Sequence, residues 1–505
     1  MRERLTVDWV VVGLLLAASV LLLSNLGNGY LWQDEAETAV LARTTRQYGY
    51  PRAFDGRSYL EIPAAYGHGP GEAWIYSPWL PFYLLAGVFA VMGESTAVAR
   101  LPFALCGLLT LYLTWRLAAQ MTRDRLVHRL SVAILTCSVP FLLHMRQCRY
   151  YALTTALVVG VCLAYLAWLR RPSARSCAWL IGALVAFFHT NFGSYVPLVI
   201  GLGLHCSFQR RSAPVPWAQV AWLAGIVGVL TVPWAMFFYR GAFIGALSVG
   251  RMFHHLEFYV RVINKYLVPL AFIGGAALVI ALLRLVWPKL RMPQRSVLAQ
   301  ASLLALVIVA QAAFLLIPDQ RQMRYLIPVV PLMAILEAWW LVQQVRWHRV
   351  VGWMIVGLVL FTNALQAPRV QIPLTQLVYE LTHPYIGPME GIVGYLRAHA
   401  RPGETVKIPY DDRTLMFYTD LVIERPSQFA QESEPDWVIL RRDWMPEGFL
   451  ESPYFRRIAA SYERIELPVP DVLWQNREDP GSHHFATVQN APHVVIYRKR
   501  LVEQG

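Results

Sequence analysis

Apolar segments long enough to cross a lipid bilayer recur along this chain, and they constrain its fold more than any other feature. Hydrophobic residues make up 56% of the 505 positions and charged residues only 15%, a composition typical of proteins that cross the membrane many times. Since each crossing needs roughly 20 mostly apolar residues, the sequence predicts an α-helical polytopic membrane protein with about eleven spans. We place them at residues 8–26, 97–119, 127–145, 150–169, 177–190, 194–208, 217–238, 266–286, 297–317, 325–343 and 350–367.

Basic residues gather in short clusters between the apolar segments. The formal net charge is +13, but the positive-inside rule explains such clusters as cytoplasmic loops. If the N-terminus is inside, all of these clusters fall on the cytoplasmic side, so we predict an N-in, C-out topology and no nucleic-acid partner. The clusters are Arg123/Arg125/Arg129, Arg170/Arg171/Arg175, Arg210/Arg211, Arg284/Lys289/Arg291/Arg295 and Arg346/Arg349.

The N-terminus and the cysteines say less about the fold than the apolar segments do. The basic start of the first apolar run could imitate a signal peptide, but no small-residue cleavage site follows cleanly, so we expect a retained anchor. The six cysteines lie in or beside apolar runs and form no CxxC. They predict neither a disulfide framework nor a cysteine-based zinc site.

The first outer loop, residues 27–96, carries an acidic patch close to a membrane exit. Adjacent carboxylates such as Asp34 and Glu35 are costly near low dielectric unless they are used. The bland interpretation is capping of a helix over Glu35–Tyr48, with Glu37 on its solvated face. Later in this loop an apolar, Pro-initiated run ends at Met92, which favours an interfacial helix lying along the membrane.

Two later segments are also expected outside. Residues 239–265 carry several cations and the neighbours His254 and His255, but adjacent histidines do not share a helix face, so a metal site is not favoured there. Beyond residue 368 the composition predicts a small soluble α/β domain. Its expected elements are a helix at Glu390–His399, a turn at Arg401–Glu404, and strands at Thr405–Pro409, Asp436–Leu440 and His493–Tyr497.

A series of motifs follows the acidic patch in a fixed order. They are Ser77-Pro78-Trp79-Leu80-Pro81-Phe82-Tyr83, Gly93-Glu94-Ser95, Ala99-Arg100-Leu101-Pro102, Arg146-Gln147-Cys148-Arg149-Tyr150-Tyr151-Ala152-Leu153, His189-Thr190-Asn191-Phe192-Gly193 and Arg324-Tyr325-Leu326-Ile327-Pro328. With Asp34-Glu35, this set resembles the GT-C glycosyltransferases, specifically the protein O-mannosyltransferase and lipid A aminoarabinose-transferase branch. The resemblance covers roughly residues 5–370.

The resemblance implies an inverting transfer of a sugar from a polyprenyl-phosphate carrier to a glycan, lipid or protein acceptor. Its general base maps to Asp34, and Glu35 matches the second acidic position, where it could orient the acceptor or the base. The implied place is a bacterial inner membrane with the site facing the periplasm. The domains would be a GT-C-like transmembrane catalytic domain at 1–367, containing the 27–96 loop, and a periplasmic α/β domain at 368–505.

A leaving phosphate needs cations, and the arginine fork matches phosphate oxygens. Several relatives carry Lys or His just before the Pro-rich segment, where this chain has Ser77. Either His68 or Arg57 substitutes, or the donor phosphate is bound by a different distribution of residues. Arg146 and Arg149 could instead snorkel to the interface. The candidate donor-phosphate ligands are Arg146, Arg149, Arg321, Arg324, Tyr325 and Arg57, and the candidate substrate-binding residues are His68, His189, Arg240 and Arg261.

Other functions stay open at this point. A lipid-linked sugar flippase or transporter would also be polytopic, although the chain shows no obvious internal repeat. A polysaccharide ligase or polymerase would use a polyprenyl-diphosphate donor. The sequence names neither the sugar nor the acceptor. No cofactor is required by any motif, while a divalent metal stays open because relatives differ.

Overall fold

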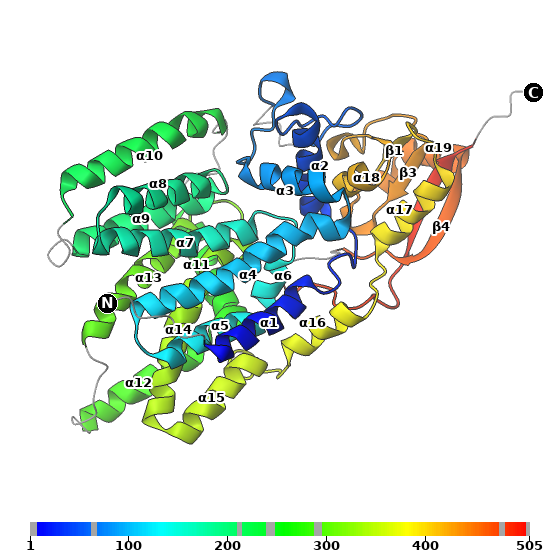
Figure 1. The fold of residues 1–505 in the computed structure, drawn as a ribbon. Coiled ribbons are helices and arrows are strands. Elements are labelled where there is room, and N and C mark those ends of the chain that lie inside the picture. Colours follow the sequence, from blue (N-terminus) through cyan, green and yellow to red (C-terminus); the bar gives the residue numbers. More distant parts are fainter. Residues whose placement is uncertain are drawn as a thin grey trace, which may run out of the picture. The chain divides into compact units, whose positions relative to one another are not determined.

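The computed structural model describes residues 8–61, 68–209, 215–238, 248–286, 295–473 and 480–500 (Figure 1). The chain forms two compact units. We call residues 1–24 and 103–378 the helical unit, and residues 25–102 and 379–505 the mixed unit. The first outer loop and the C-terminal segment therefore belong to the same compact body.

The helical unit is built almost entirely from apolar helices. A helix lies in each of the predicted apolar segments, so the helical character of this unit is confirmed, while the count of eleven spans stays a prediction. The helices are α1 (Trp9–Leu23), α4 (Thr96–Met121, begun in the mixed unit), α5 (Arg125–Cys137), α6 (Val139–Met145), α7 (Tyr151–Arg170), α8 (Ala174–Phe188), α9 (Phe192–Gln209), α10 (Trp217–Phe238), α11 (Val249–Val262), η2 (Ile263–Leu267), α12 (Leu270–Val286), α13 (Arg295–Phe314), η3 (Met323–Tyr325), η4 (Ile327–Val329), α14 (Val330–Trp347), α15 (Arg349–Phe361) and α16 (Pro373–Thr382, ended in the mixed unit).

By length and apolar composition, four helices of the described chain could each cross a membrane: Thr96–Met121, Tyr151–Arg170, Trp217–Phe238 and Met323–Trp347. The number rises to six if each of two bent helix pairs counts as one span. Several shorter apolar helices accompany them, among them α1, α8 and α15. The chain is thus a multi-pass helical membrane protein.

One predicted span is not a straight helix. The segment expected at 127–145 consists of α5 and α6, which are bent by 69°. The break falls at Ser138, whose side chain accepts a hydrogen bond from Phe141 N at the start of α6. Pro140 stands in the first turn of α6, where its missing N–H is tolerated, whereas inside a continuous helix it would remove a hydrogen bond.

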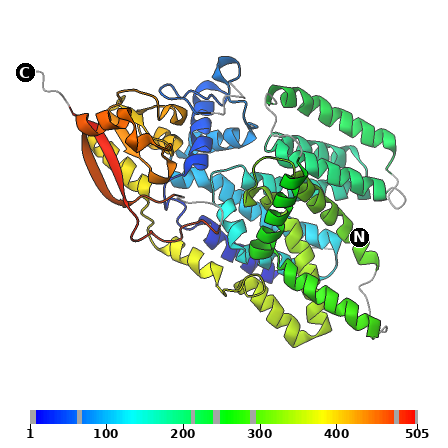
Figure 2. The same cartoon turned by 180° about the vertical axis from the view of Figure 1, so that it is seen from behind.

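Close helix packing in this unit depends on small residues. A Cβ added at Gly201 of α9 would lie only 2.8 Å from Val307 Cα of α13, so the two backbones approach more closely than a larger side chain allows. Figure 2 shows the helices of this unit from behind.

The mixed unit combines helices with one small sheet. Its remaining elements are α2 (Gln33–Tyr48), η1 (Pro70–Glu72), α3 (Leu80–Met92), α17 (Pro388–His399), β1 (Thr405–Lys407), α18 (Asp412–Tyr418), β2 (Val422–Ile423), η5 (Pro426–Gln428), β3 (Trp437–Leu440), η6 (Arg442–Trp444), η7 (Phe449–Glu451), α19 (Pro453–Ser461), β4 (Tyr462–Pro470) and β5 (His493–Lys499). The helices predicted in the first outer loop, and the helix and strands predicted beyond residue 368, are confirmed. The sequence did not predict β2, β4, α18 or α19.

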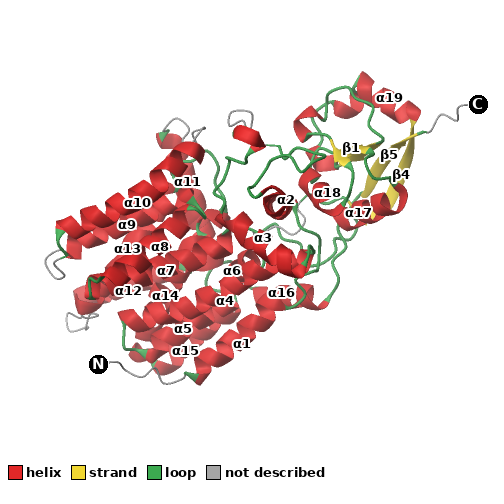
Figure 3. Cartoon of the chain, turned by 45° about the horizontal axis from the view of Figure 1, so that its top comes forward, coloured by secondary structure: helices red, strands yellow, loops and turns green. Residues whose placement is uncertain are grey.

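The strands form a single sheet in the order β2-β1-β3-β5-β4 (Figure 3). β1 pairs in parallel with β2 and β3, and β5 pairs antiparallel with β3 and β4. Val438 and Tyr497 are paired and pack with α19 in one apolar core. Side chains alternate between the two faces of a sheet, which places Val469 of β4 on the face opposite to Val438 and Tyr497. Val469 lies against Gly391 of α17. Helices therefore cover both faces.

Direct bonds join the two parts of the mixed unit. Asn28 donates to the carbonyls of Glu380 and His383, both at 3.1 Å, and accepts from Tyr385 N at 3.0 Å. Tyr30 N donates to the Glu390 carboxylate at 2.6 Å. The loop that leads into α2 is thereby tied to the start of the C-terminal segment.

Candidate active site

Asp34 lies in the first turn of α2, two residues after the capping residue Trp32. The N-terminus of a helix carries a partial positive charge, which stabilises a carboxylate placed there. α2 is otherwise largely buried, but the side chain of Asp34 is half-buried. The first predicted base therefore stands at a helix N-terminus and keeps some access to solvent.

Glu35 is fully buried, and its carboxylate is held by a partner that the sequence did not assign to the site. Arg100 of α4 donates to both of its oxygens, at 2.8 Å from Nε and 2.7 Å from Nη2. The same guanidinium also donates to the backbone carbonyls of Leu26, Asn28, Gly29 and Tyr30. This bidentate pair therefore ties Glu35 to the loop before α2.

The prediction that Glu37 lies on a solvated helix face is wrong. Its side chain is 2% exposed and forms an ion pair with Arg413 of α18. The partner lies 376 residues away in the sequence, so the local helical pattern carried no sign of it. Beside this pair, Gln33 donates to Asp412 at 2.5 Å.

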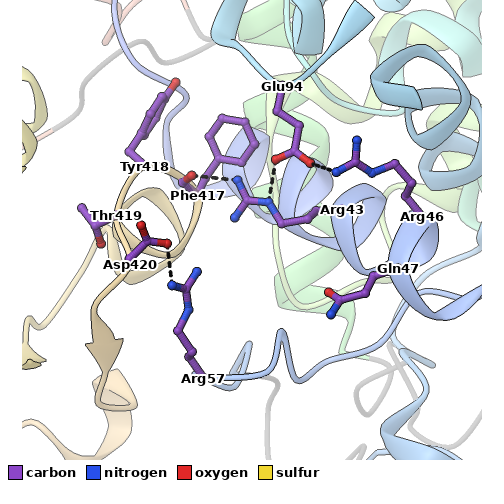
Figure 4. Close-up of a pocket in the computed structure, with 9 residues that line it drawn as sticks. All are labelled: Arg43, Arg46, Gln47, Arg57, Glu94, Phe417, Tyr418, Thr419 and Asp420. Carbon is purple, nitrogen blue, oxygen red and sulfur yellow. Dashed lines mark hydrogen bonds and ion pairs between the residues drawn. The ribbon is translucent and has the colours of Figure 1, made fainter. Parts of the chain in front are cut away.

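An open cavity of about 720 Å³ lies farther along α2 (Figure 4). Glu94 bridges Arg43 and Arg46 at 2.7 and 2.9 Å, and Arg57 pairs with Asp420 at 2.5 Å. Arg43 follows Asp34 by nine positions, which places it roughly 13 Å along the helix axis. The cavity is therefore separate from the first turn of α2. Its lining is Arg43, Arg46, Gln47, Arg57, Glu94, Phe417, Tyr418, Thr419 and Asp420.

His68 lies in the outer loop, with its ring centroid 6.0 Å from that of Tyr59. Partial burial lowers the pKa of His68, and the nearby cation of Arg425 lowers it further. The imidazole is therefore neutral at pH 7, so it could accept or donate one hydrogen bond but would not offer a positive charge to a phosphate.

Arg146 caps helices of the helical unit. It ends α6, and its Nη1 donates to the carbonyls of Leu21 and Leu22 at 2.8 and 3.0 Å. These carbonyls belong to the last turn of α1, where no intrahelical donor is available. Part of the Arg146 guanidinium is therefore occupied by hydrogen bonds to the C-terminal end of α1.

The other predicted phosphate ligands lie near helix breaks of the same unit. Arg149 stands over the Tyr150 ring at 5.3 Å, before α7. Arg324 stands over the Tyr325 ring at 5.7 Å, in η3. Arg321 is exposed and lies 5.4 Å from the Phe258 ring of α11.

The remaining predicted substrate-binding residues are His189, Arg261 and Arg240. His189 ends α8, with its ring edge-on to Phe188 and Trp234, which is a packing environment. Arg261 is an exposed residue of α11, paired with Glu257 one turn earlier at 2.5 Å. Arg240 lies outside the described residues.

In the described part of the chain, His, Cys, Asp and Glu side chains form no group of three able to hold a metal ion. The neighbours His254 and His255 accordingly have no third ligand of these types among the described residues.

Sequence reasoning missed Arg100, Asp412 and Arg413 as parts of the site. Arg100 belongs to the Ala99–Pro102 motif, and an arginine within an apolar helix is costly unless it is paired, so a signal was present. Asp412 and Arg413 carry no comparable signal, because only the fold brings them to α2.

Comparison with known proteins agrees with this architecture. Residues 76–236 match the dolichyl-phosphate-mannose-protein mannosyltransferase family. Among curated proteins, no sequence matches the chain. The fold is similar to that of ArnT from Cupriavidus metallidurans in the apo state, with a TM-score of 0.55 and 15% identity over 97% of each chain.

Two further solved structures share the fold. ArnT from Cupriavidus metallidurans bound to undecaprenyl phosphate gives a TM-score of 0.54 at 14% identity over 97% of each chain. The Archaeoglobus fulgidus oligosaccharyltransferase in complex with Zn and sulfate gives 0.50 at 13% identity, over 85% of this chain and 67% of that one. The family match over residues 76–236 and the shared fold together support a membrane glycosyltransferase of the GT-C type, similar to ArnT in fold.

Proposed function

We propose that this glycosyltransferase transfers a sugar from a polyprenyl-phosphate-linked donor to a glycan, lipid or protein acceptor, with inversion at the anomeric carbon. The undecaprenyl phosphate bound to an ArnT of the same fold supports a lipid phosphate as the carrier. The reaction would take place on the periplasmic face of a bacterial inner membrane.

The observation that carries this proposal is the contrast among the acids of α2. The side chains of Glu35 and Glu37 are only 0% and 2% exposed. Asp34 is half-buried at the helix N-terminus. A general base must reach the proton that it removes, and of these carboxylates Asp34 is the one with access.

The reaction then proceeds as a single displacement. Asp34 accepts the proton of the acceptor hydroxyl, whose oxygen forms a bond to the anomeric carbon. The bond from that carbon to the phosphate oxygen breaks on the opposite side, and the polyprenyl phosphate leaves with the electron pair. Cationic forks that stabilise the departing phosphate lower the barrier.

Arg149, Arg321, Arg324 and Tyr325 are the proposed phosphate ligands. Arg146 and Arg57 are proposed alongside them. Like Arg321, which donates to the carbonyl of His254 at 3.4 Å, each of the two also contacts a protein group. Arg261 is also committed to a neighbouring carboxylate. For Arg240, His68 and His189 a contact with substrate stays a prediction.

We also propose the full membrane arrangement suggested by the charge pattern. It has eleven spans with the N-terminus inside and the C-terminus outside, and α3 lies along the outer interface. The catalytic domain would comprise 1–367 and the periplasmic domain 368–505. Cysteine labelling from each side of the membrane would test the loops one by one.

The activity is tested in proteoliposomes with a panel of polyprenyl-phosphate-linked hexoses and pentoses, using membrane glycolipids, polysaccharides and proteins as acceptors. NMR of the product determines the anomeric configuration. Inverted product from monophosphate donors supports the proposal. Turnover confined to polyprenyl-diphosphate donors would instead indicate a ligase or polymerase, and donor translocation with no transfer would indicate a flippase.

A further inference from the structure

Two consecutive residues of the C-terminal segment, Asp412 and Arg413, bind the side chain just before Asp34 and the one three residues after it. Gln33 donates to Asp412 at 2.5 Å and accepts from Arg413 N at 3.4 Å. The Arg413 guanidinium forms an ion pair with Glu37. Gln33 and Glu37 are 8% and 2% exposed, so these contacts are inside the protein.

Other residues of α18, which is labelled next to α2 in Figure 3, contact α2 near both of its ends. The Tyr418 hydroxyl accepts from Leu31 N, two residues before α2, at 3.0 Å. Near the other end, the Arg43 fork donates to the carbonyls of Met416 and Phe417 at 3.1 and 2.8 Å. These carbonyls are among the last of α18, where no further helical turn supplies a donor.

α18 is itself fixed to the sheet through a buried charged group. Asp411, just before α18, has a positive φ of 67° and is ion-paired with Arg441. Arg441 follows β3, is 1% exposed, and also binds Asp471 at 2.8 Å and the carbonyl of Val472 at 2.8 Å. A continuous set of buried contacts therefore runs from the sheet through α18 to the first turn of α2.

We propose that Asp412 and Arg413 are positioning residues for Asp34, and this rests on the proposed role of Asp34 as the base. Gln33 and Glu37 are four residues apart and share one face of α2. Because successive residues are about 100° apart around a helix, holding that face fixes the direction in which Asp34 points. Misplacing a catalytic group by about 1 Å can cost on the order of 100-fold in rate.

The test uses full-length protein in proteoliposomes and the pair Arg413→Met and Glu37→Gln/Arg413→Met. The single variant leaves the Glu37 carboxylate buried without this cation, so it should lower the unfolding temperature. The double variant removes both charges and should recover most of that stability. We expect kcat to stay at least tenfold below wild type in the double variant, with the affinity for undecaprenyl phosphate within twofold.

Arg457→Met is the matched control. It removes another arginine–carboxylate pair of the C-terminal segment, with Glu432 at 2.5 Å, but both side chains are largely exposed. Exposed pairs contribute little, so its kcat and unfolding temperature should equal those of wild type.

The outcomes separate the two claims. A stable double variant with wild-type kcat would overturn the positioning role, and so would a parallel loss of kcat and of undecaprenyl phosphate affinity. Asp34→Asn is measured beside it. If Asp34→Asn turns over normally, the proposed base is wrong; if Asp34→Asn is inactive and the double variant is normal, the positioning role alone fails.

Discussion

Arg100 gives the neighbouring acids Asp34 and Glu35 different surroundings. It occupies both oxygens of Glu35 and four backbone carbonyls of the preceding loop. Glu35 is therefore held in place, and Asp34 beside it is presented at the helix start. The sequence identified the acidic pair, but it could not divide their roles, because the division depends on a partner 65 residues away.

At this scale we predict that Arg100→Met strongly destabilises the protein. Glu35, which is 0% exposed, would lose its bidentate cation, and breaking a buried pair in this way costs about 3–5 kcal/mol. Thermal unfolding in detergent measures the loss. Arg464→Met, which removes an exposed pair with Glu466, is the control, and equal unfolding temperatures for the two variants would contradict this account.

At the scale of elements, the sequence predicted the apolar helices best, because a long apolar run has few alternatives in a bilayer. It missed α18, whose seven residues, Asp412–Tyr418, are too short for a periodic pattern. It also missed the break at Ser138, since the apolar run continues through it. α18 depends on tertiary contacts, and the break at Ser138 depends on a single proline, Pro140.

The contact between α9 and α13 gives a prediction with a matched control. Gly201→Ala would place a Cβ 2.8 Å from Val307 Cα, whereas a Cβ at Gly203 of the same helix has nothing within 4 Å. Both changes have the same effect on helix propensity. Gly201→Ala should lower the unfolding temperature and Gly203→Ala should not. If the two variants have the same unfolding temperature, α9 and α13 do not pack as closely as described.

The outer loop gives a prediction about pH. The Glu72 carboxylate accepts from Tyr59 at 2.5 Å and from Arg52 at 2.9 Å. The hydrogen bond from Tyr59, and then that from Arg52, lowers the pKa of Glu72 below its ordinary value of 4.5. A lowered pKa means that the ionised group stabilises the fold above about pH 4.5 and that this contribution is lost as pH falls further.

Limited proteolysis of this loop as a function of pH measures the effect. Cleavage near Glu72 should increase in wild type as pH falls below about 4.5. Glu72→Gln, which cannot ionise, should be cleaved more readily at neutral pH and should lack the pH-dependent increase. A pH profile unchanged by the substitution would exclude Glu72 as the titrating group.

At the scale of the whole molecule, the sequence anticipated a membrane glycosyltransferase with a helical body and a C-terminal α/β region. It did not anticipate that residues 25–102 and 379–505 form one compact unit. Contacts such as Glu37–Arg413 and Gln33–Asp412 link positions more than 370 residues apart. No local pattern reports such contacts, which is why the acidic motif could be found from the sequence and its supports could not.

Turnover by Asp34→Asn measures whether Asp34 acts as the base. The amide has nearly the same shape as the carboxylate but cannot take up the acceptor's proton. If Asp34 is the base, kcat should fall by at least about 100-fold, the lower end of what general-base catalysis contributes, with binding of undecaprenyl phosphate unchanged. A variant that transfers sugar at the wild-type rate would contradict this role.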